Sequence, residues 1–187
     1  TFTRRLEKEE FDAGFDCHFC GMAVTATYSD GLLSMVCSEC AYQYLQVPLP
    51  PSAFENSDPE SALALIDQYL RHRTLAFSRG VCPLCANALG VEFVPGEDLW
   101  IDSLERVSVF VRYACDHCGH QHFTTVGHRL VYEPALVAFF HSHGTDITRE
   151  PLWELGFAVT DDALTVEETD PWRVTLSITE DGETLAI

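Results

Sequence analysis

The stretch CHFCGMAVTATYSDGLLSMVCSEC, residues 17–40, contains two Cys-x-x-Cys pairs that are 16 residues apart. Two residues between cysteines let both sulfurs point from one tight turn toward the same metal ion, and two such turns complete a tetrahedron of sulfur. The residues between the pairs read as a strand, an Asp30-Gly31 turn and a second strand, which would return the second pair beside the first. Residues 17–50 are therefore predicted to form a four-cysteine zinc ribbon.

The same arrangement recurs later in the chain, where CPLC at residues 82–85 and CDHC at residues 115–118 are 29 residues apart. The strand-like runs ALGVEFV and VSVFVRYAC flank the polar loop PGEDLWIDSLER. We predict a second ribbon over residues 81–126. Every cysteine of the chain then becomes a metal ligand: Cys17, Cys20, Cys37, Cys40, Cys82, Cys85, Cys115 and Cys118.

The expected cofactors are two Zn²⁺ ions. Iron at one site, as in a rubredoxin, is the alternative, because four thiolates do not by themselves distinguish iron from zinc and the longer second spacing suits that geometry. A disulfide scaffold is disfavoured, since a 187-residue chain can bury a core without such staples. A thioredoxin-like dithiol is normally a single Cys-x-x-Cys. A closed shell of four thiolates leaves no position for a substrate, so these sites are not expected to be catalytic.

The chain is strongly acidic, with 29 Asp and Glu residues against 11 Lys and Arg residues, and its formal net charge is −18. Such a charge repels phosphate, so direct contact with nucleic acid is not expected from this region. The composition resembles that of proteins from salt-loving archaea, and an acidic partner-binding face is the alternative. No apolar run is long enough to cross a bilayer, so we expect no membrane contact and a cytoplasmic protein.

A helix is predicted between the ribbons, within a segment of linker and helix over residues 51–80. Ser57 and Glu60 form a capping box at its start, and Gly80 is the expected stop. An apolar stripe should pack on the ribbons or form a dimer seam, and the arginines should lie elsewhere on the helix. The stripe consists of Leu63, Ile66, Leu70 and Phe77; the arginines are Arg71, Arg73 and Arg79.

Residues 127–187 read as a helix, YEPALVAFFHSHG, followed by the strands LWELGFAV, ALTVEE and a hairpin within WRVTLSITEDGETLAI. Together with the ribbons they predict an α+β fold: two four-cysteine zinc-ribbon modules linked by a long helix, with a C-terminal helix plus antiparallel sheet. Residues 1–16 are expected to be a helix-compatible linker from an upstream domain.

Histidines and tryptophans supply the remaining candidate sites. Helix capping by His141 and His143 and core packing of Trp153 and Trp172 are the favoured interpretations, and a small ligand pocket at these four residues is the alternative. His120 and His122 could form an accessory metal or anion site, but we expect them on the solvated face of a hairpin. The sequence contains no G-x-S-x-G, P-loop, G-x-G-x-x-G or H-E-x-x-H motif, so no catalytic residues and no enzymatic activity are predicted.

The order of these motifs resembles the C-terminal region of haloarchaeal ArsR-like winged-helix transcriptional regulators. The resemblance runs from about Phe15 onward through CHFCG, TATYSDGLLSMVCSEC, LPP, ALALIDQYLRHRTLAFSRGVCPLC, VRYACDHCG, PALVAFFHSHGTDI, PLWELGFAV and DPWRVTL. It implies a non-catalytic, zinc-binding effector or oligomerisation domain, with DNA contact made by a winged helix upstream of this region. A homo-oligomer or protein partner and a small-molecule effector are the implied partners. A metal or redox sensor that uses one labile four-cysteine centre is the alternative.

Overall fold

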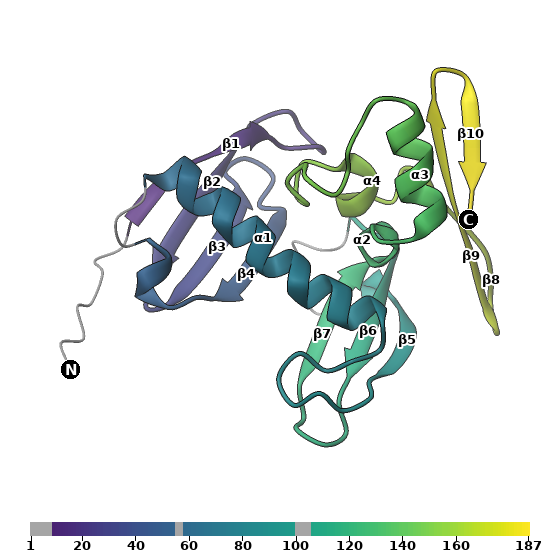
Figure 1. Cartoon of the computed structure of the whole chain (residues 1–187), viewed down its shortest axis with the longest axis horizontal. Helices are drawn as coiled ribbons and strands as arrows, with labels where there is room; N and C mark the ends of the chain where they lie inside the picture. The colour runs from purple at the N-terminus through teal and green to yellow at the C-terminus, as the bar shows by residue number, and fades with distance from the viewer. Residues whose placement is uncertain (1–8, 55–57, 100–105) are drawn as a thin grey trace. The chain divides into compact units, whose positions relative to one another are not determined.

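The computed structural model describes residues 9–54, 58–99 and 106–187 (Figure 1). The chain divides into two compact units between Tyr69 and Leu70. Its strands form three antiparallel sheets, and two clusters of four cysteines are present, so the predicted α+β class with two ribbons is confirmed. Among the described residues, no helix is long and apolar enough to cross a membrane.

The first unit is built on a four-stranded sheet with the order β1-β2-β3-β4. Its hairpin turn at Asp30 and Gly31 has φ values of 51° and 82°, as a two-residue type I′ turn requires. Alternate side chains of β2 and β3 are buried, which gives the unit its core. The bounds are β1, Glu9–Asp16; β2, Ala23–Ser29; β3, Leu32–Cys37; β4, Gln43–Pro48; and a short 3₁₀ turn follows at Pro51–Ala53.

Strand β1 departs from the prediction of a helix-compatible linker over residues 1–16. Phe11 pairs with Ala26 of β2, and its ring lies 6.1 Å from that of Phe54. Pairing with β2 decides the conformation here, because strand propensity depends on the strands and side chains that a segment packs against. Residues 1–8 of the predicted linker lie outside the described residues.

Helix α1, Pro59–Ser78, occupies the predicted position between the ribbons and crosses the boundary between the units. The carboxylate of Asp58 accepts hydrogen bonds from the N–H and the hydroxyl of Ser61, so Asp58 caps the helix. The predicted cap at Ser57 lies outside the described residues. Gly80 has a φ of +70°, and the N–H of Val81 donates to the carbonyl of Ala76, which ends the helix as predicted.

Arg71 of α1 is buried, contrary to the expectation that the helix arginines lie away from the packed face. Its guanidinium donates to the carbonyl of Ile147 at 3.1 Å and to the carbonyl of Glu150. These carbonyls belong to the segment after α3 in the second unit. A buried guanidinium is stable only when its N–H groups find acceptors, so Arg71 ties this segment to α1.

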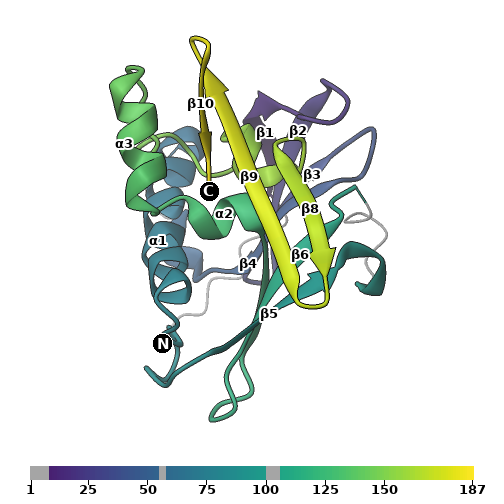
Figure 2. The ribbon, with the colours of Figure 1, turned by 90° about the vertical axis from the view of Figure 1, so that its right-hand side faces the viewer.

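The second unit contains the sheet β5-β6-β7 and, after it, three short helices and the sheet β10-β9-β8 (Figure 2). Val111 and Tyr113 of β6 pack with Phe77 of α1, and Trp172 and Val174 of β9 extend the same cluster. Residues 81–126 and 127–187, predicted as separate modules, therefore belong to one unit that begins at Leu70. The bounds are β5, Gly90–Pro95; β6, Val109–Ala114; β7, Gln121–Thr125; α2, Val126–Leu130; α3, Pro134–Ser142; α4, Gly156–Val159; β8, Leu164–Thr169; β9, Trp172–Glu180; and β10, Glu183–Ala186.

Residues 152–159 form a turn and α4 and not the predicted strand. Leu152, Leu155 and Ala158 are all buried in the core that α3 and β9 share. The N–H of Ala158 donates to the carbonyl of Leu155, so the segment satisfies its own backbone groups. A short apolar run reads the same in sequence whether it is a buried strand or a buried helical turn, because both hide every side chain.

The prediction that His120 and His122 lie on the solvated face of a hairpin is wrong. Both rings pack against Phe77, and His122 points into the core. The ring of Phe77 stacks on His122 at 4.3 Å and on His120 at 5.8 Å. Burial lowers the pKa of His122 to about 3. His128 of α2 is also enclosed, with its Nε2 3.1 Å from the hydroxyl of Thr74, and burial lowers its pKa to about 4.

These two histidines predict that acid destabilises the second unit. Their folded pKa values lie below the ordinary value of 6.5, so the unfolded chain binds protons that the folded chain does not. The stability is fully present above pH 6.5 and falls as the pH drops toward 4. Between pH 7.5 and pH 5.5 each histidine should lower the free energy of unfolding by about 1.4 kcal/mol. Urea unfolding at several pH values should show a smaller dependence of this free energy on pH for His128→Gln than for the parent. Equal dependence on pH would contradict the prediction.

Candidate metal centres

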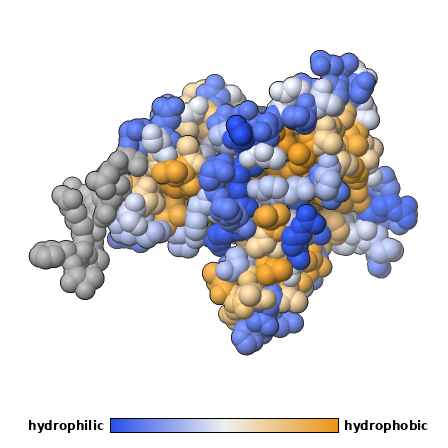
Figure 3. Space-filling view, viewed as in Figure 1, coloured by the Kyte–Doolittle hydropathy of each residue, from blue (hydrophilic) through white to orange (hydrophobic). Residues whose placement is uncertain are grey.

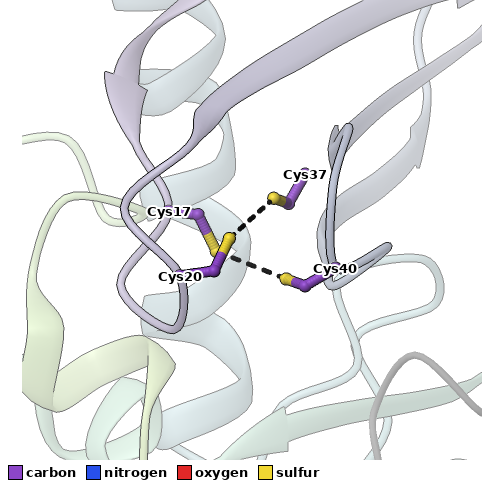
Figure 4. A group of neighbouring side chains, drawn as sticks. All are labelled: Cys17, Cys20, Cys37 and Cys40. Atoms are coloured by element: carbon purple, nitrogen blue, oxygen red, sulfur yellow. Dashed lines mark hydrogen bonds between the residues drawn. The ribbon is translucent and has the colours of Figure 1, made fainter.

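The first site gathers Cys17, Cys20, Cys37 and Cys40 at one end of the sheet of the first unit (Figure 4). Cys17 directly follows β1, and Cys37 ends β3. The Sγ atoms of Cys20 and Cys37 are 3.4 Å apart, and those of Cys17 and Cys40 are 3.6 Å apart. Four sulfurs at about 2.3 Å from one ion would be about 3.8 Å from each other, whereas a disulfide requires about 2.05 Å. The spacing fits a bound ion and not disulfides.

The second site gathers Cys82, Cys85, Cys115 and Cys118 in the second unit. The Sγ atoms of Cys85 and Cys115 are 3.5 Å apart, and those of Cys82 and Cys118 are 3.7 Å apart. In each site all four sulfurs lie within 4.8 Å of one another. All eight cysteines are free thiols, so the predicted grouping into two sites holds and each site is built to bind a metal ion.

The four Cys-x-x-Cys turns share one backbone design. In each turn the N–H of the residue four positions after the first cysteine donates to the carbonyl of that cysteine, at 2.8 to 3.0 Å. That residue has a positive φ between 58° and 73°. It is a glycine in two turns and an alanine in the other two: Gly21, Ala41, Ala86 and Gly119. Left-handed backbone suits glycine and strains alanine.

The alanine turns predict stabilising substitutions. Ala86→Gly should relieve about 1 kcal/mol of left-handed strain, because a glycine there needs no Cβ beside the carbonyl. The expected result is a higher midpoint of thermal unfolding with unchanged metal content. Ala88→Gly, two residues on, serves as the control and should not stabilise. If both variants behave alike, the strain argument is wrong.

Tyr44 of β4 lies over the first site. Its hydroxyl donates to Cys17 Sγ at 3.3 Å and accepts from the N–H of His18 at 2.8 Å. The ring of Phe15 meets Tyr44 edge-on at 5.0 Å and holds it in place. Nothing in the sequence singled out Tyr44, because it lies outside the cysteine turns and reaches Cys17 only when β4 pairs with β3. The Nδ1 of His18 lies 3.3 Å from the same hydroxyl, so this side chain contacts Tyr44 as well.

Tyr44→Phe should weaken metal binding at the first site only. The substitution removes a hydrogen bond to a ligating sulfur, and losses of such outer contacts typically cost 10- to 100-fold in metal affinity. Titration with a chromophoric chelator should show one metal ion released about 10-fold more readily and the other unchanged. Tyr69→Phe, whose side chain is exposed, is the matched control. Equal loss from both sites would contradict the assignment.

Hydrogen bonds also lower the pKa of two of the thiols, Cys17 and Cys85. The backbone N–H of Asn87 is the main cause that lowers the pKa of Cys85 to about 6. Burial would raise the pKa of Cys17, but the hydroxyl of Tyr44 and the N–H groups of Phe19 and Cys20 outweigh it and bring the pKa to about 7. A thiolate is the metal-binding form, so Cys17 and Cys85 favour the form that an ion needs. In the turn of Cys17 the N–H of Met22 lowers the pKa of Cys20, but the neighbouring thiols, Cys37 first, outweigh it and raise that pKa to about 12.

Each of the four residues of the predicted ligand pocket has its own local surroundings. His143 caps α3, with its Nδ1 2.8 Å from the carbonyl of Phe139, whereas His141 is exposed. Trp153 is buried, and Trp172 is half-buried with its ring 5.9 Å from Phe93. Capping and packing account for these residues. The structure instead has a groove of about 390 Å³ beside β9, which none of the four lines. No short motif marks that groove in the sequence.

Comparison with known proteins reaches one family. Neither the curated proteins nor the solved structures gave a match. Residues 14–187 match the family described as Domain of unknown function (DUF7351), and this range includes both four-cysteine sites and every strand from β2 to β10. The chain belongs to the DUF7351 family.

Proposed function

We propose that the chain is a zinc-stabilised, non-catalytic effector or oligomerisation domain of a transcriptional regulator. The observation that carries the proposal is the pair of closed four-thiol sites, each of which ties together segments distant in sequence. Four thiolates complete the coordination of a tetrahedral ion, so such a site stabilises its fold and offers no position for a substrate. The metals then act as clamps, and function belongs to the surfaces that they hold in place.

Zinc is the proposed ion at both sites, with iron at one of them as the alternative. Elemental analysis of the purified chain, with a visible spectrum in parallel, decides this point. Two zinc ions per chain and no colour are expected. A red, iron-containing sample would overturn the assignment of zinc to that site, because ferric thiolate centres absorb visible light and zinc does not.

The regulatory role rests on the motif order that resembles haloarchaeal ArsR-like regulators and on the charge of −18. Such a charge opposes contact with phosphates, so DNA binding would be the task of a separate winged helix. Apolar surface over the second ribbon supports a protein partner or a second copy (Figure 3). Val81, Leu84, Val91 and Phe123 are exposed there. A small-molecule effector is a further proposed partner.

Two measurements on the chain as it stands test this role. In a gel-shift assay it should fail to bind random or operator-like duplex DNA at moderate salt. Light scattering after size-exclusion chromatography should show a dimer or larger species. Tight, sequence-specific DNA binding by this chain would overturn the proposal that a separate winged helix makes the DNA contact. A strict monomer would remove oligomerisation from the proposal.

A metal or redox sensor is the second candidate, favoured by one exposed thiol in each site, Cys20 in the first and Cys118 in the second. Hydrogen peroxide would take two electrons from two thiolates, which join as a disulfide. With two protons the peroxide becomes two water molecules, and the ion is released. The sensor predicts that mild peroxide empties one site and leaves the other filled. Equal resistance of both sites would remove this candidate.

A further inference from the structure

The groove beside β9 lies within the second unit and has two kinds of lining. Its volume is about 390 Å³, within the range of small-ligand and peptide sites. Phe140, Leu155 and Ile178, which are mostly buried, contribute apolar surface together with Phe157, whose ring stacks on that of Phe140 at 5.2 Å. The polar lining includes two carboxylates, those of Glu154 and Glu180.

One wall of the groove is an edge of β9 that pairs with no other strand in the part of the chain that the structure describes. β8 pairs with β9 only as far as Leu164 opposite Leu176, and β9 continues beyond it to its hairpin with β10 (Figure 2). The last backbone bond on this side runs from the N–H of Ser177 to the carbonyl of Ala163, at 2.8 Å. Residues 178–180 of β9 extend past that bond and line the groove.

The register of β9 and β10 shows which backbone groups face the groove. Leu176 and Ile187 exchange both of their hydrogen bonds, so they form a hydrogen-bonded pair. Hydrogen-bonded and non-hydrogen-bonded pairs alternate along an antiparallel ladder, and Thr179 opposite Thr184 is therefore a non-hydrogen-bonded pair. The N–H and C=O of Thr179 point away from β10. Within the described residues, no backbone partner meets them on that side.

We propose that this groove binds an extended, basic peptide segment of a partner protein, which adds a strand to β9 at Thr179. Backbone groups of an open strand edge give affinity to an added strand, and the side-chain surface beside it gives specificity. Ile178 and Glu180 lie on the same face of β9, because side chains alternate along a strand. On that face an apolar side chain of the segment would lie on Phe157 and Ile178. A lysine or arginine two residues away would meet Glu180, and another could reach Glu154.

Charge decides the kind of partner. The groove presents the carboxylates of Glu154 and Glu180, which favour a segment rich in lysine or arginine. This chain has only 11 Lys and Arg residues against 29 Asp and Glu residues, so the added strand comes from a basic partner and not from a second copy. The inference goes beyond the proposed regulatory role, because it depends on the edge of β9 and holds whether or not the domain belongs to a regulator.

The test uses defined peptides and the full chain with its metals bound. Acetyl-Lys-Thr-Val-Thr-Lys-Thr-amide, which has its valine and both lysines on one face when extended, should bind in calorimetry and shift the amide resonances of Thr179 and Phe157. The same peptide N-methylated at its two central residues keeps its charge but cannot pair along either edge. It should bind about 10-fold more weakly, because one lost backbone bond is already worth a large part of a tenfold change.

Two double variants separate the groove from general attraction to an acidic chain. Glu154→Gln with Glu180→Gln should weaken binding of the unmethylated peptide by about 10-fold. Glu167→Gln with Glu168→Gln makes the same change of charge on β8, outside the groove, and should leave binding nearly unchanged. Absent binding, equal binding of the methylated peptide, or equal effects of the two double variants would each overturn the proposal.

Discussion

Cys115→Ser should unfold the second ribbon and lower the metal content from two ions per chain to one. Cys115 is buried at the end of β6, and the site that it completes joins the turn after α1 to the sheet. A structural zinc site contributes on the order of 10 kcal/mol to folding, which is comparable with the whole stability of a typical domain. The ribbon cannot retain its fold after this loss.

Circular dichroism, thermal unfolding and elemental analysis on the same samples check this result. His117→Ser provides the control, because His117 is exposed in the same turn and is not a ligand. It should keep two ions and the parent unfolding midpoint. A folded Cys115→Ser variant with two ions would show that the second site is not a four-thiol clamp.

Gly127→Ala should be the most damaging glycine substitution in the second unit. A Cβ at Gly127 of α2 would lie 1.7 Å from the carbonyl oxygen of Phe157 and 2.7 Å from its carbonyl carbon. Both are backbone atoms of α4, so no side-chain rotation relieves the overlap and the helices must move apart. Overpacking a core costs about 1–3 kcal/mol and occasionally more, and we expect the upper end here.

For a chain of this size, a loss of about 3 kcal/mol lowers the unfolding midpoint by on the order of 10 °C. Gly90→Ala is the matched control, because its Cβ would meet its nearest atom, the carbonyl oxygen of Ala114, at an ordinary 3.6 Å. Its midpoint should stay within about 2 °C of the parent. If Gly127→Ala matches that behaviour, α2 and α4 are not in the close contact that the structure describes.

Features with local causes could be predicted from the sequence. The spacing of the cysteines fixes the two sites, because ligand geometry acts over a few residues. The Asp30-Gly31 turn and the stop at Gly80 follow from backbone conformations that few residues adopt. The alternation of buried and exposed side chains along β2 and β3 also follows from the sequence, because one face of each strand is buried.

Features that depend on distant partners could not be predicted. β1 becomes a strand because β2 lies beside it, and residues 152–159 form a turn and α4 because Leu152, Leu155 and Ala158 pack into the core of the second unit. The sequence predicts Arg71 on the surface, because its hydrogen-bond acceptors, the carbonyls of Ile147 and Glu150, lie more than 70 residues away along the chain. The groove is formed by four separate segments of the second unit and leaves no pattern in any one of them.

The unequal spacing of the two ribbons has a consequence for loop entropy. The turns of the first site are separated by 16 residues and those of the second by 29. The entropy lost on closing a flexible loop grows only with the logarithm of its length, so this difference amounts to about 0.5 kcal/mol. It is small beside the free energy of binding an ion to four thiolates. The excursion between the turns of the second ribbon can therefore lengthen or shorten by several residues with little effect on metal affinity, provided that β5 and β6 still pair.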